Sequence, residues 1–86
     1  MPEISRFFGI VISIFYDDHN PPHFHAKYGE FKTKIDIQDL RVLEGFFPSR
    51  ALGLVVEWAS SNRENLLDDW ELAKNGKQLL PIEPLK

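Results

Sequence analysis

Residues 23–36 read HFHAKYGEFKTKID, two alternating segments joined by Gly29-Glu30. Alternation of apolar and polar side chains with a period of two is typical of a β-strand that is buried on one face. Gly29-Glu30 suits a two-residue type II′ turn with glycine at its first central position. The stretch therefore predicts an antiparallel hairpin in which Tyr28 lies opposite Phe31.

This register assigns every side chain of the hairpin to one of two faces of the sheet. We expect the core face to carry Phe24, Ala26, Tyr28, Phe31, Thr33 and Ile35. The other face then carries His23, His25, Lys27, Lys32, Lys34 and Asp36, with His23 opposite Asp36. The polar groups of the hairpin are thus concentrated on one surface.

Regular structure is also predicted on both sides of the hairpin. Residues 7–16 are rich in β-branched and aromatic side chains and predict one central strand, and residues 41–44 predict a short fourth strand. Apolar residues then recur every 3.6 positions up to Ala73, which predicts helix from near Pro48 to a stop at Asn75-Gly76.

The helical region has two interpretations. A single helix of about 27 residues would be ~40 Å long. The alternative is a break near residues 60–62, where Ser61 and Glu64 form a capping box. We favour one helix because the apolar stripe keeps its phase. The expected fold class is α+β, a small antiparallel sheet of three to four strands packed against one long or bent C-terminal helix.

Length and composition set limits on the class of protein. The 86 residues suit a single domain, with the sheet at about 5–45, the helix at about 48–75 and an extended tail at 77–86. No apolar run approaches the ~20 residues that span a bilayer, so we expect a cytoplasmic protein with no membrane partner. The net charge of −3 argues against binding nucleic acid by global charge, although a local basic patch is compatible with it.

The three histidines of the chain all lie within residues 17–25. His23 and His25 are two residues apart on a predicted strand, so both rings project from the same face. Together they can bind one divalent metal ion, zinc or manganese. Asp36 is the expected third ligand, or the group that orients His23. Because the chain has no cysteine, any metal must be held by histidine or carboxylate.

The loop before the predicted hairpin decides whether further groups join this cluster. An extended Asn20-Pro21-Pro22 would hold His19 ~12 Å from His23. His19, a candidate general acid or base, and the neighbouring Asp17 and Asp18 join only if the loop turns back, for example through a cis Asn20-Pro21 bond. In the alternative interpretation, the histidines merely shape a turn.

Two other surfaces are candidates for binding. Lys27, Lys32 and Lys34 form a small basic patch where Lys27 and Lys34 can hold a phosphate, although a solvated sheet face is the favoured explanation of the three lysines. On the helix, Trp70 and Leu72 sit farther out from the sheet and are the expected exposed contacts for a protein partner or for a second copy of the chain.

Several segments together resemble a small bacterial family, the domain of unknown function 4160. The similar segments are residues 1–10, 18–25, 35–37, 42–45, 57–59 and 65–73, which cover nearly the whole chain. The resemblance implies no catalytic residue. It does imply a partner, because members of this family are often encoded beside another small protein, in an arrangement similar to toxin–antitoxin pairs.

Two functions follow as hypotheses, and whether the protein is an enzyme stays open between them. The first is a protein-binding component of a two-gene module, either toxin–antitoxin-like or regulatory, that uses Trp70 and Leu72. The second is a metal-dependent hydrolase or nuclease that uses the His23-x-His25 strand.

Overall fold

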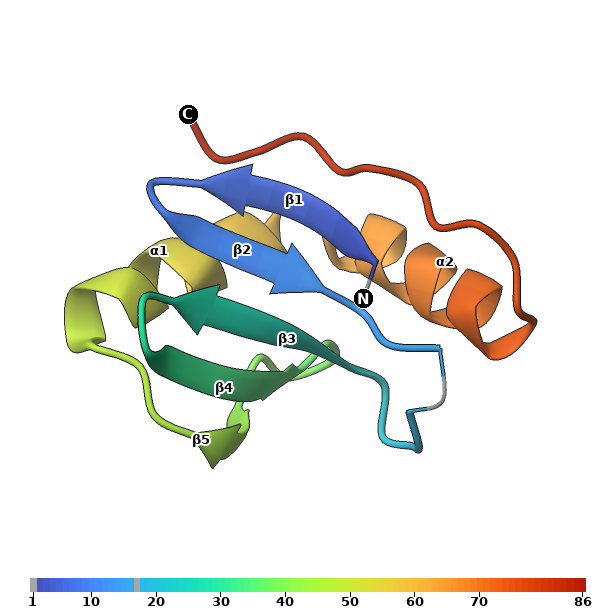
Figure 1. The fold of residues 1–86 in the computed structure, drawn as a ribbon, viewed down its shortest axis with the longest axis horizontal. Coiled ribbons are helices and arrows are strands. Elements are labelled where there is room, and N and C mark those ends of the chain that lie inside the picture. Colours follow the sequence, from blue (N-terminus) through green and yellow to red (C-terminus); the bar gives the residue numbers. More distant parts are fainter. Residues whose placement is uncertain (1, 17) are drawn as a thin grey trace.

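A computed structural model describes residues 2–16 and 18–86. Five antiparallel strands form one sheet in the order of the sequence, and two helices follow them (Figure 1). The elements are β1 (Glu3–Phe7), β2 (Ile10–Ser13), β3 (His23–Tyr28), β4 (Phe31–Asp36), β5 (Val42–Gly45), α1 (Ser49–Ser60) and α2 (Arg63–Lys74).

The predicted central hairpin, β3 and β4, is confirmed with its register. Tyr28 pairs with Phe31, His25 with Lys34 and His23 with Asp36. Gly29 has a positive φ of 59°, as the first central residue of a type II′ turn requires. Apolar–polar alternation was sufficient here because a shift by one residue would turn Phe24 and Ile35 out of the core.

The prediction of three to four strands is wrong, since residues 7–16 do not form one strand. The chain reverses at Phe8-Gly9, whose φ angles are 50° and 81°, and pairs β1 with β2. Positive φ at both central residues defines a type I′ turn, which usually carries Asn-Gly. Phe8 hides this turn in the sequence, because a bulky aromatic residue rarely adopts that conformation.

The prediction of one long or bent helix is also wrong. Helix α1 ends at Ser60, and α2 begins at Arg63 after the N-cap residue Asn62. The Asn62 side chain donates to the carbonyl of Trp58, whereas the expected capping box of Ser61 and Glu64 does not form. A helix of ~40 Å would overhang a domain whose longest dimension is 33 Å.

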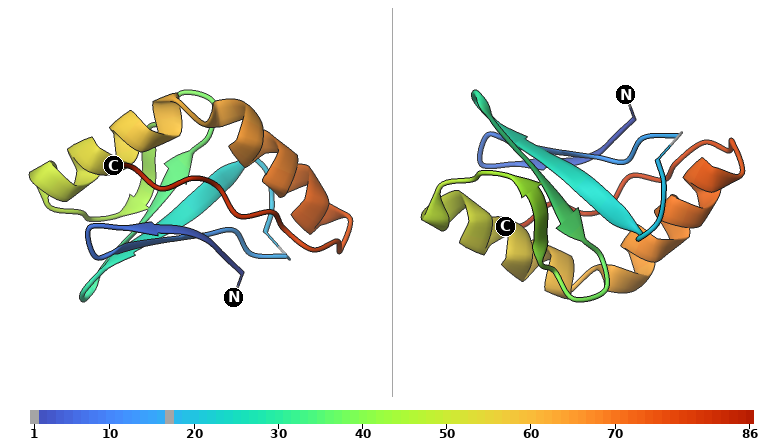
Figure 2. Two further views of the ribbon diagram at one scale, coloured as in Figure 1. Left: turned by 90° about the horizontal axis from the view of Figure 1, so that it is seen from above. Right: turned by 90° about the horizontal axis from the view of Figure 1, so that it is seen from below.

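The two short helices cover the same face of the sheet, as both views in Figure 2 show. Ile12, Phe24 and Ile35 from the sheet are fully buried together with Val55 and Trp58 from α1. Within the described residues no helix lies over the opposite face, and none is long and apolar enough to cross a membrane. The sheet is therefore buried on one side and open on the other.

The C-terminal tail, residues 77–86, runs along the β1 edge of the sheet (Figure 1). The amide of Ile82 donates to the carbonyl of Ile4, and the indole of Trp58 donates to the carbonyl of Glu83. The carboxylate of Asp69 accepts from the amide of Leu80. These bonds cover an edge strand that would otherwise offer backbone groups to another chain.

Candidate metal centre

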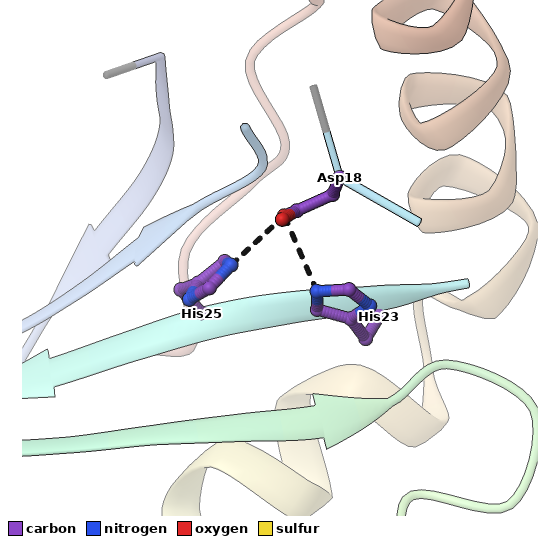
Figure 3. A group of neighbouring side chains, drawn as sticks. All are labelled: Asp18, His23 and His25. Atoms are coloured by element: carbon purple, nitrogen blue, oxygen red, sulfur yellow. Dashed lines mark hydrogen bonds and ion pairs between the residues drawn. The ribbon is translucent and has the colours of Figure 1, made fainter. Parts of the chain in front are cut away.

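Asp18, His23 and His25 bring their side chains together at one end of the sheet (Figure 3). The histidines are alternate residues of β3, and Asp18 comes from the loop between β2 and β3. That loop turns back over the strand, and its Asn20–Pro21 peptide bond is cis. One candidate ligand atom from each of the three side chains lies within 4.8 Å of the other two.

One carboxylate oxygen faces both imidazoles. Asp18 Oδ2 lies 2.9 Å from His25 Nε2 and 3.2 Å from His23 Nε2. The contact with His25 is a hydrogen bond. The contact with His23 is not, and Nε2 of His23 is buried without a hydrogen-bond partner among residues 2–16 and 18–86.

The tautomer of His23 follows from its other ring nitrogen. Nδ1 lies 2.8 Å from the carbonyl oxygen of Pro21, and because a carbonyl only accepts, Nδ1 carries the proton. In the neutral form of the ring, Nε2 would then have a lone pair that faces the carboxylate of Asp18. Metal-binding histidines are commonly oriented in this way, by donating their other nitrogen to a backbone carbonyl.

His25 is held between two neighbours. Its ring stacks on Phe15 at a centroid distance of 3.9 Å and 11° between planes, while Nε2 bonds to Asp18. Burial lowers the pKa of His25 below its ordinary value, and Lys34 and His23 act in the same direction against the opposing effect of Asp18. The ring is thus biased toward the neutral form, which is the form that binds metals.

Trp70 closes the buried side of the cluster. Its ring centroid lies 5.2 Å from that of His23, and the side chain is only 2% exposed. The expectation that Trp70 offers an exposed partner contact is therefore wrong. Leu72 is also partly buried and packs against the core. The bend between α1 and α2 turns this part of the helix toward the end of the sheet.

Asp36 does not join the cluster, although it pairs with His23 in the register. Its Oδ1 accepts hydrogen bonds from the amides of Gln38 and Asp39, at 2.7 and 3.1 Å, and so shapes the turn after β4. Its expected role as a metal ligand is therefore wrong. Asp18 supplies the carboxylate of the cluster in place of Asp36. The sequence predicted this only on condition that the loop before β3 turned back.

The other residues predicted for the site are not among the three converging side chains. His19 is exposed next to Asp18 in the loop and is not part of the converging group. Asp17 lies outside the described residues. Lys34 bonds to Glu44 at 3.3 Å, while Lys27 is exposed farther along β3.

Two histidines and one carboxylate that converge on one point are a ligand set used by zinc and by non-haem iron. Three protein ligands leave further coordination positions for water or for a substrate. The arrangement can therefore hold a reactive metal ion, and not only a structural one, whose site would be closed by four protein ligands.

Comparison with curated proteins finds no match, and neither does comparison with solved structures. A family model does match residues 9–71, which include β2 to β5, the loop with Asp18 and most of both helices. This match covers most of the 86 residues and both histidines of the cluster. The chain belongs to the family described as a domain of unknown function, DUF4160.

Proposed function

We propose that this protein binds a divalent transition-metal ion through Asp18, His23 and His25 and uses it to activate water for hydrolysis. The observation that carries the proposal is that His23 Nε2 is buried, has no hydrogen-bond partner among residues 2–16 and 18–86, and faces a carboxylate oxygen at 3.2 Å. Two acceptors repel each other at that distance unless a cation lies between them.

A metal ion satisfies all three groups of this cluster at once. It would take the lone pair of His23 Nε2, replace the proton that His25 Nε2 donates to Asp18, and neutralise the charge of Asp18. A proton on His23 Nε2 would serve only the contact between His23 and Asp18. Burial lowers the pKa of His25 and so disfavours its charged form, which weighs further in favour of the metal. Zinc fits best, because it accepts nitrogen and oxygen ligands with one position left for water.

The chemistry of such a centre is hydrolytic. Zinc lowers the pKa of its bound water to about 7, which supplies hydroxide at neutral pH. His19, which adjoins Asp18 in the loop, is the proposed general acid or base for the leaving group. Its ring is free to turn toward a bound substrate, because the side chain is exposed.

The test substitutes His25 and uses His19 as its matched control. Zinc and manganese are titrated calorimetrically into wild type, His25→Gln and His19→Gln, and the ring nitrogens are followed by NMR. We expect one metal per chain, lost in His25→Gln and kept in His19→Gln. If wild type and His25→Gln bind metal equally, the centre does not exist.

A second candidate function is binding of a small protein partner in a toxin–antitoxin-like or regulatory module. Exposed aromatic side chains favour it, since Phe8 and Phe46 are 61% and 65% exposed. They lie by the β1–β2 turn and after β5, whereas the metal cluster lies by the β2–β3 loop. Co-purification with the product of an adjacent gene, lost in Phe8→Ser with Phe46→Ser, tests this function.

A further inference from the structure

A groove of about 270 Å³ on the open face of the sheet begins beside the metal cluster. It shares His25 with that cluster and continues over β2, β3 and β4. The side chains of the open face that line it are those of Val11, Ser13, Phe15, His25, Lys27 and Lys32. Any molecule in this groove therefore lies next to the proposed metal ion.

The far end of the groove carries two unneutralised positive charges. Lys27 and Lys32 are directly opposed in the register of β3 and β4. Like charges in this position destabilise a sheet. Within the part of the chain that the structure describes, neither lysine forms an ion pair, whereas Lys34 beside them is paired with Glu44. An anion between Lys27 and Lys32 would remove this repulsion.

We propose that this groove is the substrate site of the metal centre, and that its substrate is a single-stranded nucleic acid. The proposal rests on the proposed metal-dependent hydrolysis and names its substrate class. One phosphate lies at the metal ion, and a neighbouring phosphate lies between Lys27 and Lys32.

The spacing of the residues agrees with this substrate. Lys27 lies two residues from His25 along β3, or ~6.8 Å at the rise of an antiparallel strand. This distance is similar to that between successive phosphates of an extended nucleic-acid strand. Phe15 beside His25 and Val11 opposite Lys27 provide apolar surface in the groove, which suits a sugar or base and not a simple inorganic anion.

The shape of the site favours a chain over a compact metabolite. The groove is slightly smaller than the ~300–1,000 Å³ of pockets that enclose a small ligand. It also lies on a sheet face that no helix of the described residues covers (Figure 2). A nucleic-acid strand can therefore enter and leave the groove along the face of the sheet, with only one nucleotide unit held in the groove.

The net charge of −3 does not oppose this inference, because several acidic side chains lie on the helices, away from the groove. Lys27, Lys32 and Lys34 lie on the open face, while Glu57, Glu64 and Asp68 lie on the helices of the covered side. A polyanion approaching the open face therefore meets the basic side of the molecule.

Hydrolysis of a phosphodiester in this position is balanced by one water molecule. A metal ion held by Asp18, His23 and His25 would activate the attacking water, which releases one proton to solvent. Its oxygen forms the new bond to phosphorus, and one ester bond from phosphorus to oxygen breaks. The leaving oxygen takes up a proton, for which His19 is the proposed donor. The products are a phosphate monoester and an alcohol.

The experiment measures fluorescence anisotropy of a labelled short oligothymidylate, with thymidine monophosphate as competitor, in the presence of zinc. The variants are Lys27→Gln and Lys32→Gln. The matched control is Lys74→Gln, which removes the same charge from the exposed end of α2. We expect each groove variant to weaken binding several-fold and to reduce the slope of log K against log salt by about 0.7. The control should bind like the wild type.

Every outcome decides the proposal. Groove variants that bind like Lys74→Gln overturn it, as does an oligonucleotide that does not bind. If thymidine monophosphate competes with the same affinity per molecule as the oligothymidylate, the proposal of a nucleic-acid strand is wrong and the ligand is a small phosphate ester. Calorimetric zinc titration of the lysine variants separates the two proposals, because zinc binding without oligonucleotide binding rejects the groove and leaves the metal centre standing.

Discussion

The Nδ1 atom of His23 lies 2.8 Å from the carbonyl oxygen of Pro21, so the ring donates its proton there and turns Nε2 toward Asp18. The loop before β3 thus sets both the tautomer of one ligand and the position of another. The loop thereby places Oδ2 of Asp18 opposite Nε2 of His23. The same oxygen also faces His25.

Replacement of Asp18 by asparagine tests this arrangement directly. The amide keeps the size of the side chain but removes the charge and half of its acceptor capacity. We expect zinc affinity to fall by more than the ~10–100-fold that loss of an outer hydrogen-bond partner costs. Calorimetric titration measures it, with Asp68→Asn on the exposed surface of α2 as control. Equal losses in the two variants would count against a specific role for Asp18.

Asp69 predicts a dependence of stability on pH. Burial raises the pKa of this carboxyl, against the opposing effect of the Leu80 amide, and Asp68 raises it further. A raised folded-state pKa means that the contribution of Asp69 to stability is full below its unfolded pKa of about 3.9 and is lost as the pH rises through the folded value. Ionised Asp69 therefore destabilises the protein at neutral pH.

Asp69→Asn should accordingly unfold at a higher denaturant concentration than wild type at neutral pH, because the amide oxygen still accepts from Leu80. The difference should shrink below a pH of about 4, where the wild-type carboxyl is protonated in both states. Urea unfolding at both pH values measures it. A difference that is the same at both would exclude titration of Asp69 as its cause.

Phe8→Asn should stabilise the fold by about 1 kcal/mol, since a non-glycine residue in the left-handed region stores of that order and asparagine tolerates it. Phe8 has φ 50° and is mostly exposed, so little packing is lost. Phe46→Asn is the control, because Phe46 is equally exposed but has no positive φ. Thermal unfolding compares them, and equal shifts would show that removal of an exposed aromatic group is the whole effect.

Two glycines should respond in opposite directions to alanine. At Gly45, φ is 88° and an added Cβ would collide with the backbone carbonyl of Lys32, so Gly45→Ala should cost more than about 1 kcal/mol. At Gly53, inside α1, nothing lies in the way, and Gly53→Ala should stabilise by about 0.4–1 kcal/mol. Urea unfolding of both variants checks the pair. A stable Gly45→Ala protein would show that β5 can shift away from β4.

The sequence by itself determined the β3–β4 hairpin, its register and the shared face of His23 and His25. These follow from local rules, because side chains alternate along a strand and a glycine at the turn sets the pairing. A short strand near β5, a helix start near Pro48 and a stop at Asn75-Gly76 were predicted for similar reasons, each within one residue of the observed bounds. The match of the chain to its family was likewise visible in the sequence.

Only the tertiary structure decided the rest. The apolar stripe of residues 52–73 keeps its phase across residues 60–62, so the break between α1 and α2 reflects the size of the sheet and not the local pattern. That break buries Trp70 against His23. The sequence favoured Asp36 as the third ligand and admitted Asp18 only if the loop turned back. In the structure the turn after β4 engages Asp36, and the returning loop brings in Asp18. A metal centre depends on distances between atoms of separate segments, which local preferences do not set.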